Sequence, residues 1–149
     1  MLRKQLAGIT GAMGIALLAG CASGGLEENS PYDQVQGNYA GVLPCADCSG
    51  IDTRLMIENQ NDVSGTFTMK SKYLGKGDAK KNDPMVTEGQ VMVMKDVGPN
   101  QYPIVYQLTG GDGTAVYNLL PLSNGNLQIL SRDYTKIPSN TDLTLKRLK

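Results

Sequence analysis

Hydrophobic and polar side chains alternate along most of the chain beyond Gly37. In the first clear run, Ile51 and Leu55 fall on one face of an extended chain, and Asp52 and Arg54 fall on the other. This alternation is typical of half-buried β-strands, and the polar segments between the runs are typical of turns. The pattern predicts eight strands: Asn38–Leu43, Ile51–Glu58, Val63–Lys70, Val86–Lys95, Ile104–Thr109, Thr114–Leu122, Leu127–Arg132 and Asp142–Arg147.

The predicted strands favour an all-β domain with a simple meander. No stretch beyond residue 37 shows a helical period of adequate length, and Asn124-Gly125 is a strong hairpin signal. About eight strands in a domain of this size are most economically closed into an antiparallel barrel, because closure removes exposed strand edges. Such a barrel is either packed inside or holds one small ligand.

The first twenty residues have the order of a bacterial signal peptide. Arg3 and Lys4 precede an uncharged, largely apolar stretch, and the segment Leu18-Ala19-Gly20-Cys21 resembles a lipobox, whose cysteine sulfur is acylated. A transmembrane anchor is the alternative, but a span needs about 20 predominantly apolar residues, and this stretch ends in glycine and serine. We therefore predict a signal peptide over residues 1–20 and lipidation of Cys21.

The chain after Cys21 divides into a tether and one domain. Residues 21–36 are polar and contain Gly, Ser and Pro, which predicts a flexible tether on the membrane. Residues 37–149 form the predicted β-barrel domain. Ala22 follows the cysteine, and by resemblance to other bacterial lipoproteins this favours the outer membrane, with the domain in the periplasm or at the cell surface.

The charge balance excludes several classes of function. The chain has 14 basic and 14 acidic residues, and removal of Arg3 and Lys4 with the signal peptide leaves 12 basic against 14 acidic. No basic field is present to bind nucleic acid. Histidine is absent, which removes the usual general base and any serine–histidine triad. We therefore expect a protein that is not an enzyme.

The chemistry of the chain is concentrated in the Cys-x-x-Cys motif of Cys45 and Cys48. Pro44 precedes the motif and Gly50 follows it, so the two thiols lie in a loop between two predicted strands. A structural disulfide is one interpretation, because an exported protein meets an oxidising compartment. Thiol–disulfide exchange is another, although this motif usually exchanges on a thioredoxin-like frame that the sequence lacks.

A soft-metal site is the third interpretation. Thiolates and thioethers select Cu(I), so Cys45 and Cys48 are candidate ligands of that ion, which is the only candidate cofactor. Met92 and Met94 are weaker candidates because they share one face of a predicted strand, although filling the core explains a methionine equally well. A closed zinc site is not expected, since it needs four ligands and histidine is absent.

The segment around the motif resembles the copper-resistance lipoprotein family called NlpE, also known as CutF. The resemblance is carried by Gly37-Asn38-Tyr39-Ala40-Gly41-Val42-Leu43-Pro44-Cys45-Ala46-Asp47-Cys48-Ser49-Gly50-Ile51, and more weakly by Tyr73-Leu74-Gly75-Lys76 and the closing Leu143–Leu148. It implies a lipocalin-like β-barrel, an outer-membrane lipid anchor, and a role in copper tolerance and envelope-stress signalling through the Cpx sensor kinase. The alternative function is a lipocalin-like carrier of a small apolar ligand.

Two departures from the family pattern qualify this resemblance. The best-known members carry a second, OB-fold domain with its own cysteine pair, which the printed sequence does not contain, so signalling that depends on that domain is in doubt. The family also often has a Gly-x-Trp segment in a middle strand. Glu88-Gly89-Gln90-Val91-Met92 stands there instead, which implies different packing.

Overall fold

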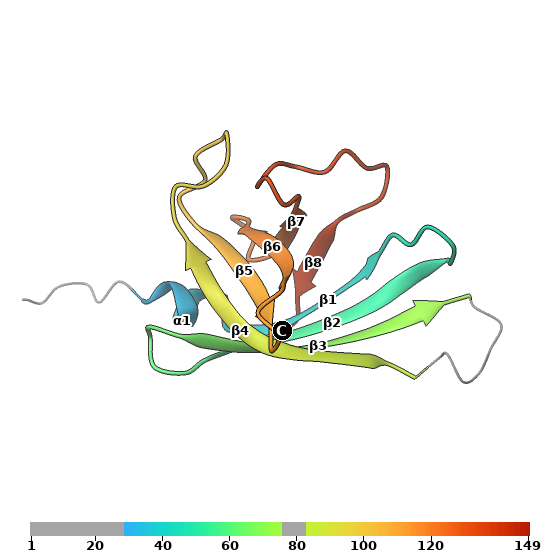
Figure 1. The fold of residues 1–149 in the computed structure, drawn as a ribbon, viewed down its shortest axis with the longest axis horizontal. Coiled ribbons are helices and arrows are strands. Elements are labelled where there is room, and N and C mark those ends of the chain that lie inside the picture. The colour runs from blue at the N-terminus through green and yellow to red at the C-terminus, as the bar shows by residue number, and fades with distance from the viewer. Residues whose placement is uncertain (1–28, 76–82) are drawn as a thin grey trace, which may run out of the picture.

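The computed structural model describes residues 29–75 and 83–149, and antiparallel β-structure dominates it (Figure 1). Within these residues, each of eight strands pairs antiparallel with the next, and the last pairs with the first to close a barrel. The predicted all-β antiparallel barrel is confirmed. The strands are β1 (Gly37–Leu43), β2 (Gly50–Asn59), β3 (Gly65–Leu74), β4 (Met85–Met94), β5 (Val105–Gly110), β6 (Ala115–Pro121), β7 (Leu127–Leu130) and β8 (Thr144–Arg147).

Several predicted strand boundaries differ from the structure by one to four residues, and the β2–β3 hairpin shows why. Val63 was expected to begin a strand, but it lies in the turn and its side chain is 75 % exposed. Polar side chains extend the turn: the Asn59 Oδ1 accepts from the Asp62 backbone N–H at 2.8 Å, and the Asn61 Oδ1 accepts from the Val63 N–H at 3.2 Å. These side-chain bonds compete with the strand ladder, so β3 starts only at Gly65.

The inward side chains of the strands form one hydrophobic core. On β2, buried Leu55 and Ile57 alternate with exposed Arg54 and Met56, as the period of two predicts. Fully buried members come from five further strands and include Tyr39, Tyr106, Leu108, Leu119, Leu127 and Leu145. Large inward side chains count against the alternative of an apolar carrier, which needs a lined cavity inside the barrel.

A short helix, α1 (Pro31–Val35), packs against one end of the barrel (Figure 1). The side chain of Val35 is only 2 % exposed and belongs to the core. The Tyr39 hydroxyl donates to the Val35 carbonyl at 2.7 Å, and the Tyr106 hydroxyl donates to the Pro31 carbonyl at 2.8 Å. Two buried tyrosines therefore fasten the helix to the strands.

The helix corrects the prediction of a flexible tether over residues 21–36. Polar composition suggested a mobile segment, but the end of that segment supplies a buried valine and the carbonyl acceptors for tyrosines of the barrel. Ser30 begins the helix, because its Oγ accepts from the Asp33 backbone N–H at 3.1 Å. Residues 21–28 of the predicted tether and the predicted signal peptide lie outside the described residues.

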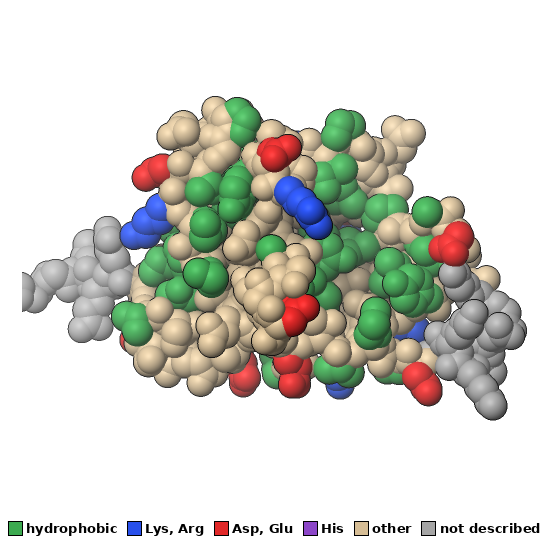
Figure 2. Space-filling view, in the orientation of Figure 1, with side chains coloured by type: hydrophobic (Ala, Val, Ile, Leu, Met, Phe, Trp, Pro, Cys, Tyr) green, Lys and Arg blue, Asp and Glu red, His purple; other side chains and the backbone are tan. Residues whose placement is uncertain are grey.

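The outer surface mixes hydrophobic and polar side chains. On the face drawn in Figure 2, charged side chains stand singly rather than in a field of one sign. Large hydrophobic side chains with more than a third of their surface exposed include Val42 on β1, Met56 on β2, Val86 on β4 and Leu148 after β8. Met56 and Leu148 line one groove on this surface.

Candidate functional site

The candidate site is the loop of residues 44–49 between β1 and β2. Pro44 follows the last residue of β1 and has no N–H with which to continue the strand ladder. At the start of β2, Gly50 has a φ of +156°, which side-chain-bearing residues rarely adopt, and a Cβ there would lie 2.6 Å from the Val42 Cγ1, so glycine is favoured at this position. The Ser49 N–H donates to the Leu74 carbonyl at 3.0 Å, which ties the loop to the end of β3.

Cys45 and Cys48 are joined in a disulfide, with their Cα atoms 5.3 Å apart. Both side chains are half-buried, so the bond is reachable from solvent. The Cys45 Sγ lies 3.4 Å from the Asp47 Oδ1, and the Cys48 Sγ lies 3.2 Å from the Gly50 carbonyl oxygen. The two sulfurs and one carboxylate oxygen of Asp47 all lie within 4.8 Å of one another.

This geometry allows two mutually exclusive states. Oxidised sulfurs are bonded to each other and carry no thiolate charge, whereas only reduced thiolates are good ligands for a soft cation. The spacing would let both sulfurs, with the Asp47 carboxylate beside them, surround one small ion. Sequence reasoning found the two cysteines. It did not predict the support that β3 gives the loop, which follows from the pairing of Gly50 with Leu74.

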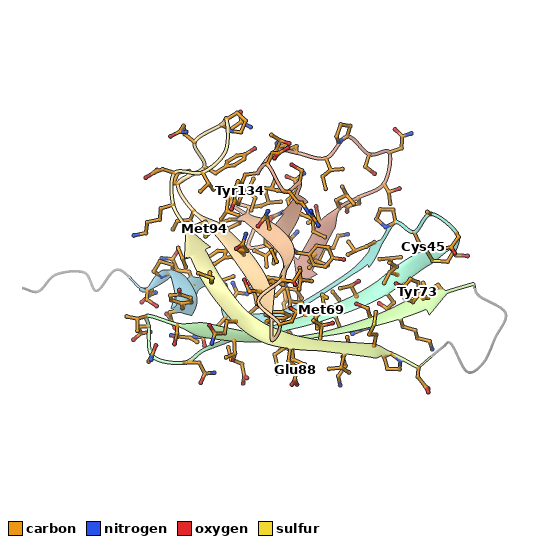
Figure 3. The ribbon with its side chains drawn as sticks, viewed as in Figure 1. Cys45, Met69, Tyr73, Glu88, Met94 and Tyr134 are labelled. Atoms are coloured by element: carbon orange, nitrogen blue, oxygen red, sulfur yellow. A yellow bond between two sulfur atoms is a disulfide. The ribbon has the colours of Figure 1, made fainter. Side chains whose placement is uncertain are left out.

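The structure does not bring the candidate methionines to the cysteines. Met92 and Met94 share the outer face of β4, as their spacing predicted. Figure 3 shows Met94 and Cys45 at opposite ends of the molecule. Thr109 Oγ1 lies 3.8 Å from the Met92 Sδ, and Met69 is buried in the core at 5 % exposure. A copper site at the loop would therefore have to use ligands other than Met92 and Met94.

Tyrosines of the barrel interior carry perturbed pKa values. Burial raises the pKa of Tyr106 to about 12, with smaller contributions from nearby Tyr39 and Tyr32. Burial also raises the pKa of Tyr117, to which Tyr73 adds. Figure 3 places Tyr73 at the same end of the molecule as Cys45. With their pKa values raised, the phenols of Tyr106 and Tyr117 stay neutral at physiological pH.

Comparison with known proteins decides the family. The model of the NlpE N-terminal domain matches residues 39–140, which includes the whole candidate loop. The chain belongs to the NlpE family. Lipoprotein NlpE of Escherichia coli (strain K12) is 50 % identical to this chain over 38 residues, which are 26 % of this chain and 14 % of that protein.

Two solved structures are similar to this NlpE-family chain. The crystal structure of the Cpx pathway activator NlpE from Escherichia coli aligns with a TM-score of 0.51 and 26 % identity, over 76 % of this chain and 51 % of that one. A putative lipoprotein from Shewanella oneidensis aligns with a TM-score of 0.48 and 30 % identity, over 75 % of this chain and 87 % of that one. This chain thus spans about half the length of the solved Escherichia coli NlpE.

The predicted lipidation site, Cys21, lies outside the described residues. Across residues 29–75 and 83–149, no helix combines the length and hydrophobicity needed to cross a bilayer.

Proposed function

We propose that this NlpE-family domain is a lipid-anchored envelope sensor rather than a catalyst, and that Cys45 and Cys48 are its redox- or Cu(I)-responsive pair. The observation that carries the proposal is the placement of both sulfurs and the Asp47 carboxylate within 4.8 Å of one another, in a loop open to solvent. A bond across two intervening residues stabilises a fold little, about 2 kcal/mol in the chain-entropy model. A role in sensing explains its exposed position better than a role in stability.

The two states of the pair would serve as the signal. Reduction of the disulfide by an external dithiol transfers two electrons and two protons to the pair, produces two thiols and leaves the dithiol oxidised to its disulfide. Binding of Cu(I) then releases the thiol protons, because thiolates are the ligands. Copper and the disulfide compete for the same sulfurs, so copper tolerance and redox sensing would be two outputs of one loop.

The proposed location follows from the first residues of the chain. Cleavage after residue 20 would leave Cys21 to carry acyl chains, and two or more chains anchor a protein stably. Because α1 belongs to the domain, the tether would shorten to residues 22–30. We place the domain at the outer membrane, in the periplasm or at the cell surface. The Cpx sensor kinase is the proposed partner, since the similar Escherichia coli protein is described as a Cpx pathway activator.

A Cu(I) competition titration tests the site. The reduced polypeptide of residues 29–149 contains every described element of the barrel and lacks the lipid-bearing Cys21. We expect binding of one ion per chain that is lost in Cys45→Ser/Cys48→Ser. The matched control, Met92→Leu/Met94→Leu, should bind like the unchanged chain, because Met94 lies at the opposite end of the molecule from Cys45 and Met92 is two residues from Met94 on β4. Equal, weak binding by the cysteine variant and the unchanged chain would contradict the copper site.

A Cpx reporter tests the signalling role in cells. Cells that produce the full chain should respond to copper, and Cys45→Ser/Cys48→Ser should abolish that response while the protein stays at normal abundance. An unchanged response would contradict the role of the pair in signalling. Fractionation of Cys21→Ala, compared with the unchanged protein, tests the anchor.

A further inference from the structure

A row of cations crosses the outer face of the barrel, away from the cysteine loop. Arg54 on β2 stands directly opposite Lys70 on β3, and Ala40 on β1 separates Arg54 from Lys146 on β8. Like charges directly opposite each other destabilise a sheet. No ion pair joins Arg54 or Lys70 to a carboxylate within the described part of the chain. The face therefore sets two cations side by side, with Asp52 and Glu88 at positions diagonal to Lys70.

The same two cations line a groove of about 460 Å³. Lys149 also lines the groove, and Met56 and Leu148 line it with hydrocarbon. Their side chains are 38 % and 44 % exposed, so part of their apolar surface is left uncovered. The volume falls within the usual range for small-molecule sites, about 300–1,000 Å³.

No Asp or Glu side chain lines this groove, although two acidic side chains lie beside it on the same face of the sheet. Asp52 stands opposite Lys72 in the next row of the β2–β3 pair. Glu88 on β4 is opposite Thr68 and points away from the barrel in Figure 3, on the outer face to which Arg54 and Lys70 also belong. The groove therefore has the cationic side chains of Arg54 and Lys70 in one region and the apolar side chains of Met56 and Leu148 in another.

We propose that this groove binds one molecule of an anionic acyl lipid. A carboxylate or phosphate headgroup lies between Arg54 and Lys70, where it accepts charge-assisted hydrogen bonds and relieves the repulsion between the two cations. Thr68 offers a further hydroxyl beside the headgroup. The first part of the acyl chain lies against Met56 and Leu148 and covers their exposed surface. This site is independent of the function proposed for the cysteine loop.

The lining favours a lipid over two other anionic partners. A nucleic acid needs an extended basic field, whereas Asp52 and Glu88 stand among the basic residues of this face. An acidic peptide would use the cations but would leave the hydrocarbon of Met56 and Leu148 uncovered. The headgroup can be a fatty-acid carboxylate or a lipid phosphate, because a guanidinium and an ammonium bind both.

Calorimetric titration of residues 29–149 in the disulfide form tests the site. The probes are dodecanoate and monododecyl phosphate, each below its micelle concentration. Two comparison probes each lack one feature: inorganic phosphate has the charge but no alkyl chain, and dodecyl maltoside has the alkyl chain but no charge. We expect saturable binding of at least one anionic amphiphile and much weaker binding of both comparison probes. Dodecanoate and dodecyl phosphate separate the two headgroup sources.

Variants on the same sheet face locate the binding. Arg54→Gln/Lys70→Gln should weaken binding by about tenfold or more, because two charge-assisted contacts are lost. The matched control is Lys72→Gln, which removes a cation from the neighbouring row and should leave affinity unchanged. The double variant should be at least as stable as the unchanged chain, because it removes a like-charge pair. Its loss of binding would therefore not reflect unfolding.

Four results would overturn the proposal. These are equal binding of dodecyl maltoside, equal binding of inorganic phosphate, unchanged affinity in Arg54→Gln/Lys70→Gln, and tighter binding of a tetraglutamate peptide than of either amphiphile. The last result would identify the groove as a site for an acidic protein segment. None of them bears on copper binding at Cys45 and Cys48, so the two proposals can fail separately.

Discussion

Replacement of Gly89 by alanine should destabilise the barrel strongly. Gly89 lies on β4 opposite Gly110 of β5, where the two strands approach each other closely. A Cβ at position 89 would lie 2.8 Å from the Thr109 carbonyl carbon and 2.9 Å from the Gly110 Cα, and still closer to the Thr109 carbonyl oxygen. These obstacles are backbone atoms, so no side-chain rotation can relieve the clash.

The loss of stability in Gly89→Ala depends on which backbone atoms must move to admit the added methyl group. An added methyl group in a well-packed interior costs about 1–3 kcal/mol, and an immovable backbone obstacle puts Gly89→Ala at the upper end. If β4 and β5 separate, each lost ladder hydrogen bond adds about 1 kcal/mol. We therefore expect a loss of about 3–4 kcal/mol in the free energy of unfolding, a large part of the stability of a typical domain of about 5–15 kcal/mol.

Urea denaturation followed by far-ultraviolet circular dichroism measures this loss, since the chain lacks tryptophan. Gly111→Ala is the matched control, because a Cβ there would meet no atom within 4 Å. It should change the free energy of unfolding by less than about 1 kcal/mol. If Gly89→Ala were as stable as Gly111→Ala, the close approach of β4 and β5 would not exist in solution, and the reasoning would be refuted.

Three further predictions concern the core, the helix and the disulfide. Leu119 is fully buried, so Leu119→Ala should lower the free energy of unfolding by about 2–5 kcal/mol in the same urea assay, and a change below 1 kcal/mol would contradict the packed interior. Tyr106→Phe removes the hydrogen bond to Pro31 and should cost about 1 kcal/mol at neutral pH. The pKa of Tyr106 rises from 10.0 to about 12 in the folded protein, which then holds the proton more tightly than the unfolded chain, so its contribution to stability is lost as the pH rises from 10 through 12. Urea titrations across this range should show a steeper loss for the unchanged chain than for Tyr106→Phe, and parallel curves would contradict the shift. Cys45→Ser/Cys48→Ser should cost no more than about 2 kcal/mol, and a larger loss would make the disulfide a structural element.

The alternation of side chains predicted the barrel because it records which face of each strand is buried. Leu55 and Ile57 are buried and Arg54 and Met56 are exposed, as their spacing on β2 requires. The same local signal was wrong at Val63, where hydrogen bonds from asparagine side chains extend the turn. The alternation of side chains indicates which positions are buried, but it carries no information about side-chain hydrogen bonds that compete with strand pairing.

The helix α1 shows a second limit of local reasoning. Its residues are mostly polar and the helix is short, so the sequence alone indicated a flexible segment. Its position depends on acceptors for the hydroxyls of Tyr39 and Tyr106, and Tyr106 is 75 positions from its partner Pro31. A hydrogen bond between residues so far apart in sequence leaves no local pattern.

By itself, the sequence determined the all-β fold, the family, and the two cysteines of the candidate site, because alternation and a specific local motif depend only on neighbouring residues. Only the tertiary structure decided which other groups join them. It places Asp47 beside the sulfurs and Met94 at the far end, and it sets Arg54 against Lys70 in one groove. These relations depend on the register between strands and on the closure of the barrel, which no local pattern specifies.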